Sequence, residues 1–103
     1  MSASPSRPSS ASSLPKSLQL GQCAKGWRGI ITALSGAELP ALTWIELERQ
    51  LLEMGFVEGA RVEICHEGPF SGDPIAVRLD DATIAIRRRD AAAILVCTME
   101  QLP

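Results

Sequence analysis

The residues best suited to chemistry are Cys65 and His66, which are adjacent, followed by Glu67 and later by Asp73. Thiolate, imidazole and carboxylate groups are ligands of divalent transition metals. Neighbouring residues of a strand point to opposite faces, however, and a stable site needs several converging ligands. We therefore predict an exposed histidine, a half-buried cysteine and no metal site. Weak binding of a divalent transition metal is the only cofactor interaction left open.

The sequence contains no recognisable catalytic set. His66 is the single histidine, so a serine or cysteine nucleophile has no other imidazole base. The phosphate-loop, dinucleotide-binding and zinc-protease motifs are missing. Asp80 and Asp81 are paired carboxylates, but they lie in an expected turn, where solvent surrounds them. We expect Cys23 and Cys97 to be small apolar side chains of the interior, and we predict that the protein is not an enzyme.

Arg87, Arg88 and Arg89 form the only basic run of the chain, and Arg61 and Arg78 are candidates to extend it. A solvated surface explains such a run, and so does a docking surface for an acidic partner or for lipid headgroups. Phe70 lies in a cluster of turn-forming residues, where it is either a core residue or an exposed contact residue. We take Phe70 and the three consecutive arginines as the predicted partner-binding residues.

Length and charge restrict the function further. The chain has 103 residues, enough for one small domain, and ten Lys and Arg against twelve Asp and Glu give a net charge of −2. Binding to nucleic acid by counterion release needs a basic face, so nucleic acid is not an expected partner. No apolar run approaches the roughly 20 residues of a membrane span. The three cysteines do not suggest a disulfide scaffold, and the N-terminus does not look like a signal peptide. We expect a cytoplasmic protein.

The chain divides near residue 18. Residues 1–17 are rich in serine and proline, and we predict a disordered tail there. Residues 18–103 form the predicted folded domain. Alternating apolar residues predict strands at 27–34, 61–66, 75–79, 83–87 and 94–96, with a short helical turn near 88–91. Five short strands and one helix favour a mainly β fold, a small and strongly bent barrel, with the helix between the first and second strands.

The helix is predicted from a capping box and an apolar stripe. Residues 43–46 match the capping-box pattern, in which the Thr43 hydroxyl and the Glu46 carboxylate each accept a free amide. The stripe is formed by Trp44, Leu47, Leu51 and Met54, and Ile45 and Leu52 widen it. Gly55 is expected to end the helix in a left-handed conformation.

Three blocks of sequence, at residues 51–59, 72–77 and 84–96, resemble FeoA-like domains. These are small Src-homology-3-like (SH3-like) barrels of bacterial ferrous iron uptake systems, and a related barrel forms the C-terminal domain of DtxR-type metal-dependent repressors. The resemblance covers roughly residues 18–98 and implies an SH3-like barrel.

Five residues in these blocks are predicted to shape turns. Gly55 and Gly59 allow the backbone to leave a helix and enter a strand within a few residues. Gly72, Asp73 and Pro74 form a sharp hairpin entry, since glycine supplies unusual torsions, aspartate bonds nearby amides and proline fixes its φ.

The chain also departs from the family pattern. Gln50 and Glu58 stand where family members commonly carry an arginine and a proline, and the segment before the helix is longer, with residues 39–44 inserted. The missing arginine removes a cation that docking could use, and the insertion could supply contact surface. The departures therefore concern the partner-binding face more than the fold.

The resemblance implies a non-enzymatic accessory protein of ferrous iron transport. Such a protein would bind and modulate a FeoB-type GTP-binding membrane permease, and it would be peripheral to the membrane through that partner. The alternative is a transition-metal-binding regulatory domain akin to the repressor barrel. A weak homodimer through exposed strand edges is a further expectation.

Overall fold

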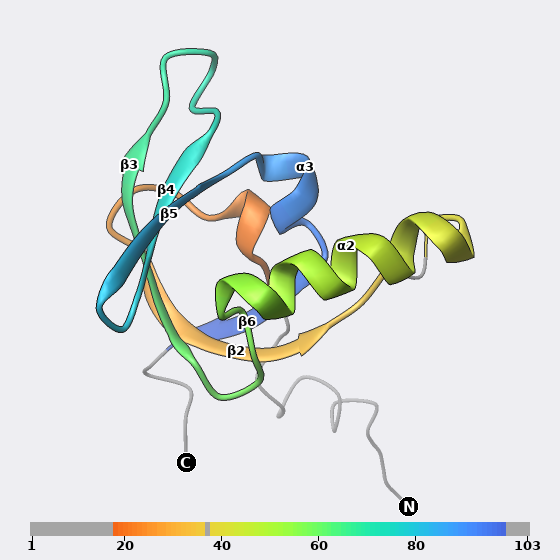
Figure 1. Ribbon diagram of the computed structural model, residues 1–103. Coiled ribbons are helices and arrows are strands. Elements are labelled where there is room, and N and C mark those ends of the chain that lie inside the picture. The colour runs from red at the N-terminus through yellow and green to blue at the C-terminus, as the bar shows by residue number, and fades with distance from the viewer. Residues whose placement is uncertain (1–17, 37, 99–103) are drawn as a thin grey trace, which may run out of the picture.

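The computed structural model describes residues 18–36 and 38–98 (Figure 1). The predicted tail at residues 1–17 and the last five residues of the predicted domain lie outside the described residues. The strands are β1 (Leu18–Gln19), β2 (Arg28–Leu34), β3 (Arg61–Glu67), β4 (Ile75–Leu79), β5 (Ala82–Ile86) and β6 (Ile94–Thr98). The helices are the 3-10 helix η2 (Leu20–Gln22), α2 (Ala41–Met54) and α3 (Arg88–Ala91).

All the strands pair antiparallel in one sheet with the order β1-β6-β2-β3-β4-β5. The five predicted strands and the helical turn are confirmed to within two residues. The short strand β1 and the helix η2 were not predicted, because two residues cannot show an alternating pattern. The described sheet therefore has six strands rather than five, and α2 lies between its second and third strands.

Two bulges bend the sheet. The register shifts between Ile31 and Ala33 in β2 and between Ile64 and His66 in β3. In the first bulge the Thr32 hydroxyl donates to the Leu95 carbonyl oxygen at 3.2 Å. Bulges increase strand twist, and the sheet accordingly curls around its interior (Figure 1).

The barrel has a seam. The ladders of the described residues begin at β1 and end at β5, and no ladder joins these two strands. Each edge strand instead leads into a short helix, since η2 follows β1 and α3 follows β5. These two helices contact one another. The sheet is thus closed at the seam by helix contacts rather than by strand pairing.

Apolar side chains from nearly every element fill the interior. Alternation places Val62 and Ile64 of β3 inward, as predicted, and both are buried. The largest fully buried side chains are Phe56, Leu20, Ile31, Leu51, Ile64, Ile75, Ile94, Val77 and Val96.

None of the helices in the described part of the chain combines the length and the apolar character of a membrane span.

The predicted capping box of α2 is wrong. The helix begins at Ala41 with Pro40 as its N-cap, and no side chain caps it. The Trp44 amide donates to the Pro40 carbonyl oxygen at 2.9 Å. Thr43 therefore lies inside the first turn, where it cannot cap the start of the helix. Gly55 does end the helix, with φ 105° and its amide directed at two carbonyl oxygens of the last turn.

Only one side of α2 faces the barrel. Leu51 is fully buried, and Trp44 and Leu47 pack partly buried against the core. Met54, the last residue of the predicted stripe, is 37% exposed. The prediction that Ile45 and Leu52 widen the stripe is wrong, since both are exposed. Each follows an inward residue by one position, which is about 100° around the helix. The barrel does not extend that far.

Leu51 and Leu52 therefore form a matched pair for measuring what the inward face contributes. We expect Leu51→Ala to lower the free energy of unfolding by about 2–5 kcal/mol, because it leaves a cavity in a filled core. Leu52→Ala should change it by less than about 1 kcal/mol. Urea unfolding of both variants gives the comparison, and equal losses would contradict the assigned orientation of α2.

Candidate partner-binding site

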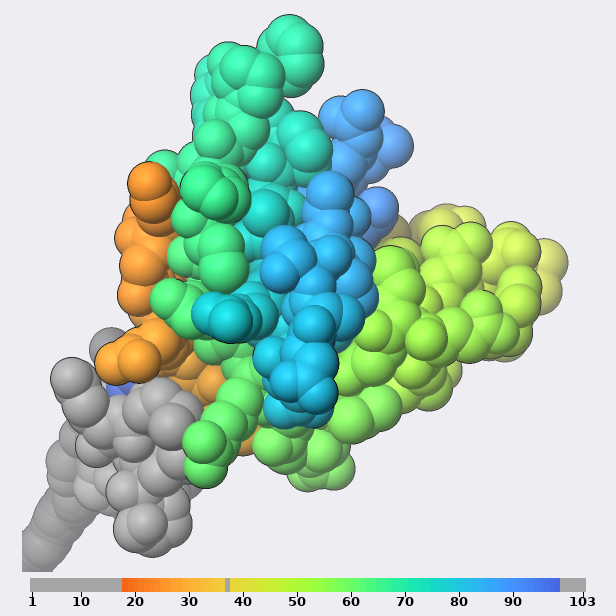
Figure 2. Space-filling view, turned by 60° about the vertical axis from the view of Figure 1, so that its left-hand side comes forward, coloured from red at the N-terminus to blue at the C-terminus, as the bar shows by residue number. Residues whose placement is uncertain are grey.

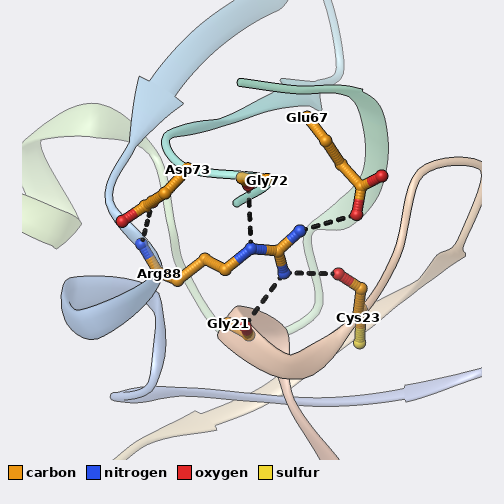
Figure 3. A network of polar contacts seen from close by, with 6 residues as sticks. All are labelled: Gly21, Cys23, Glu67, Gly72, Asp73 and Arg88. Atoms are coloured by element: carbon orange, nitrogen blue, oxygen red, sulfur yellow. Dashed lines mark hydrogen bonds and ion pairs between the residues drawn. The ribbon is translucent and has the colours of Figure 1, made fainter. Parts of the chain in front are cut away.

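The Arg88 side chain holds three separate parts of the chain together (Figure 3). Its Nε donates to the Gly72 carbonyl oxygen at 2.9 Å. Its Nη1 donates to the carbonyl oxygens of Gly21 at 3.0 Å and Cys23 at 2.7 Å. Its Nη2 forms an ion pair with Glu67 Oε2 at 2.7 Å. One guanidinium thus joins α3, the segment around η2 and the β3–β4 hairpin at the seam.

Asp73 completes this connection from the hairpin side. Its Oδ1 accepts the backbone amide of Arg88 at 2.9 Å. Arg87, the N-cap of α3, makes no side-chain cap of its own. The carboxylate therefore satisfies an amide that the start of a helix leaves free. Asp73 was expected to bond an amide close to it in the sequence, but the amide it accepts lies fifteen residues later. The peptide bond between Asp73 and Pro74 is cis.

Two glycines allow the close approach. A Cβ at Gly21 would collide with the carbonyl oxygen of Arg88. Gly72 has φ 82°, which favours glycine, and a Cβ there would lie 3.2 Å from Arg88 Nη2. Gly55 and Gly59, the other predicted turn glycines, have φ values of 105° and 91°.

Phe70 lies at the end of the β3–β4 hairpin. The Gly68 amide donates to the Pro74 carbonyl oxygen at 2.8 Å, and Phe70 and Asp73 each donate an amide to the other's carbonyl oxygen at 3.3 and 3.2 Å. Phe70 is 77% exposed. The hairpin end protrudes from the body of the molecule (Figure 2). Of the two alternatives for Phe70, core or surface, the structure supports the surface.

The three consecutive arginines do not form one patch. Arg88 has a side chain only 23% exposed, and its guanidinium is used internally, whereas Arg87 and Arg89 are exposed. Arg89 lines two hollows of about 240 and 470 Å³ beside Leu39, ahead of α2. Partner contact by Arg88 stays a prediction, and its bonds favour a positioning role. Arg87 and Arg89 are the exposed candidates for contact.

A second group of arginines lies on the outer face of the sheet, separate from the run. Arg28, Glu63 and Arg78 face one another across β2, β3 and β4. With Arg61 and Asp80 they line a hollow of about 410 Å³. The sequence suggested that Arg61 and Arg78 extend the basic run, but cross-strand register, which a single sequence does not display, places both of them here.

The four candidate metal ligands, Cys65, His66, Glu67 and Asp73, do not converge on one point in the structure. The described residues contain no group of three or more His, Cys, Asp and Glu side chains that could hold a metal ion. Cys65 is half-buried in the β3 bulge and His66 is exposed. The carboxylates of Glu67 and Asp73 both bond to Arg88. Weak binding of a divalent metal stays a prediction.

The two remaining thiols lie inside. Cys23 and Cys97 are buried. Burial raises the pKa of the Cys23 thiol above its ordinary value of 9.0, and the positive charge of Arg88 offsets part of that increase. The Cys23 thiol is therefore protonated at neutral pH.

The sequence profile of the FeoA domain matches residues 18–97. The chain belongs to the FeoA-domain family. Among curated proteins, none matches this chain. FeoA domains form a family of small accessory domains, which is not a known enzyme family.

Solved structures share the fold. The FeoA-like protein from Clostridium acetobutylicum is 24% identical, with a TM-score of 0.70 over 84% of this chain and 91% of that one. FeoA from Stenotrophomonas maltophilia, complexed with zinc, is 23% identical, with a TM-score of 0.63 over 77% of this chain and 88% of its own. It is described as a procaryotic SH3 domain protein and as a possible ferrous iron transport activating factor.

A manganese-dependent transcriptional repressor is 26% identical, with a TM-score of 0.68 over 82% of this chain. The match spans only 43% of that repressor. The predicted SH3-like, mainly β fold and the predicted relationship to FeoA and to the repressor barrel are confirmed.

Replacement of Arg88 should separate its role from those of its neighbours. We expect Arg88→Ala to lower the free energy of unfolding by about 1.5–3 kcal/mol, because it leaves carbonyl groups at the seam without their charged donor. Arg88→Lys should recover little, since an ammonium group cannot reproduce the planar fork. Thermal and urea unfolding measure the effect. Arg87→Ala, the control, should stay within about 0.5 kcal/mol, and an equal loss there would contradict the assignment.

The burial of the thiols predicts an order of alkylation. In the native protein, iodoacetamide should modify Cys65 first, and Cys23 and Cys97 only after unfolding, because the reactive species is an accessible thiolate. Peptide mass spectrometry follows the three sites, and similar rates at all three would contradict the described packing. Because the pKa of the Cys23 thiol is higher in the folded state than its ordinary value of 9.0, the free energy of unfolding should be independent of this group below pH 9.0 and should fall as the pH rises from 9.0 to the folded pKa.

Proposed function

We propose that this protein is a non-enzymatic accessory factor of ferrous iron transport, which acts at the cytoplasmic face of the membrane by binding a FeoB-type GTP-binding permease. Membership of the FeoA-domain family supports the link to iron transport. The description of the Stenotrophomonas protein as a possible transport activating factor supports it further. The single observation on which the binding role rests is the exposed Phe70 at the end of an anchored hairpin.

The hairpin and α3 together supply the proposed contact surface. Phe70 offers an aromatic anchor, the kind of residue that often dominates binding energy in interfaces. Arg87 and Arg89 offer guanidinium groups on either side of Arg88 in the chain. Because Arg88 bonds to Gly72 and to Glu67, the base of the hairpin is fixed to α3. The two backbone segments that carry the aromatic and the cationic side chains are thereby fixed to each other before any partner binds, which lowers the entropy cost of association.

Binding at this surface would modulate transport only through a difference between two states of the permease. A ligand shifts an equilibrium by no more than its differential affinity for the two states. The protein would therefore change nucleotide turnover or gating if its surface fits one state of the permease better than the other.

The test is a binding measurement between the full chain and the purified permease of the same cell. We expect Phe70→Ala/Arg87→Ala/Arg89→Ala to weaken binding at least about tenfold, since anchor residues of an interface commonly account for such losses. Surface plasmon resonance against the captured permease gives the affinities. Absence of binding by the wild-type chain would contradict the proposed function.

The matched control removes one apolar and two cationic side chains elsewhere on the surface. Val57→Ala/Arg61→Ala/Arg78→Ala changes exposed residues away from the hairpin end and α3. This variant should bind the permease as the wild type does. If both triple variants bind equally, the proposed surface is wrong even though the partner is right.

A further inference from the structure

The outer side of α2 carries a second apolar stripe. Leu42, Ile45, Arg49 and Leu52 follow one another at spacings of three, four and three residues. The inward stripe has the same spacing but is displaced by two residues, and a two-residue offset is about 200° around a helix. The two stripes therefore lie on nearly opposite sides of α2. The outer stripe has the alternating three- and four-residue spacing of residues that pack between two helices in a coiled coil.

None of the described residues covers this outer stripe. Leu42 is 82% exposed, Ile45 59% and Leu52 46%. The N-terminal part of α2 extends beyond the sheet, and Figures 1 and 2 both show it projecting from the barrel. A row of large apolar side chains on one helix face is typical of an interaction site rather than of scattered surface residues.

Acidic residues flank the stripe on both sides. On a helical projection Glu46 and Glu53 lie along one side of it, and Glu48 lies along the other. Arg49, inside the stripe, bonds to Glu46 Oε2 and Glu53 Oε2 at 3.5 Å each. Three glutamates against one arginine leave the helix negatively charged, and the single arginine is already held by two of the glutamates.

The negative charge of α2 distinguishes among three possible binding partners of its apolar stripe: a membrane, a second copy of α2, and a helix of another protein. Helices that lie on membranes carry lysine and arginine beside the apolar face, because the cytoplasmic leaflet is anionic. A second copy of α2 would place two acidic borders against each other, and like charges across an interface are unfavourable. A helix whose apolar stripe is bordered by basic residues complements both the apolar face and the charge.

We propose that Leu42, Ile45 and Leu52 dock an amphipathic helix of a partner protein whose apolar stripe is bordered by lysine and arginine. Arg49 lies between Ile45 and Leu52 in the stripe. Glu46 and Glu53 pair with its guanidinium, and its aliphatic stem lengthens the apolar surface. This surface is distinct from Phe70 and the exposed arginines of α3. The inference does not rest on the proposed function, and its partner is defined by chemistry alone.

The test uses the full chain and two synthetic helical peptides of equal length. One has leucine at heptad a and d positions and lysine at the flanking positions, and the other has glutamate in place of lysine. We expect fluorescence anisotropy to show at least about tenfold tighter binding of the lysine peptide at physiological salt. The NMR resonances of residues 41–54 should shift on titration with it.

Leu42→Gln/Ile45→Gln should weaken binding of the lysine peptide at least about tenfold and leave the circular dichroism spectrum unchanged. Val57→Gln, which alters an exposed apolar residue outside α2, should bind as the wild type does. Equal binding of the two peptides, or unchanged binding by the double variant, would overturn the proposal. The proposal would also be overturned if the wild type forms a dimer that the double variant does not form. It would be overturned as well if the wild type binds anionic phosphatidylserine vesicles and the double variant does not.

Discussion

The hydrogen bonds of the Arg88 guanidinium are the interaction on which the closure of this small barrel depends. In the part of the chain that the structure describes, the six-stranded sheet has no ladder between β1 and β5, and this leaves a seam between its two edges. Here one planar group with several donors satisfies carbonyl oxygens at Gly21, Cys23 and Gly72 and a carboxylate at Glu67. Lysine could not do this, because its ammonium lacks the planar geometry.

The residues that close the barrel also fix the hairpin and α3, the segments that carry the proposed contact surface, to each other. Asp73 caps α3 from the hairpin, and Arg88 returns the contact from α3 to Gly72. The two bonds run in opposite directions between the same segments, so that the hairpin carrying Phe70 and the turn carrying Arg87 are fixed to one another. A contact surface on a small domain needs such fixing, because flexible side chains and loops lose entropy on binding.

Much of the fold could be predicted from local patterns. The strand alternation at Val62 and Ile64 and the glycine that ends α2 each act over a few residues, and the sequence displays them directly. What could not be predicted depends on residues far apart in the chain. Arg88 belongs to a run that looks like a solvated patch, and it becomes internal because Gly21 and Cys23, more than sixty residues earlier, and the β3–β4 hairpin approach it. The start of α2 was misplaced for a local reason, since Pro40 begins a helix without the side-chain cap that the capping-box pattern assumes.

The same limit explains the misinterpreted faces of α2. A sequence shows that Ile45 and Leu52 are apolar, but it does not show how wide a surface the barrel offers to the helix. The barrel holds α2 mainly through Leu51 near its C-terminal end, with Trp44 and Leu47 partly covered. Burial of apolar area favours covering every such residue, so an apolar stripe that the fold leaves exposed, bordered by glutamates, is more readily explained by an external partner than by the stability of the chain itself.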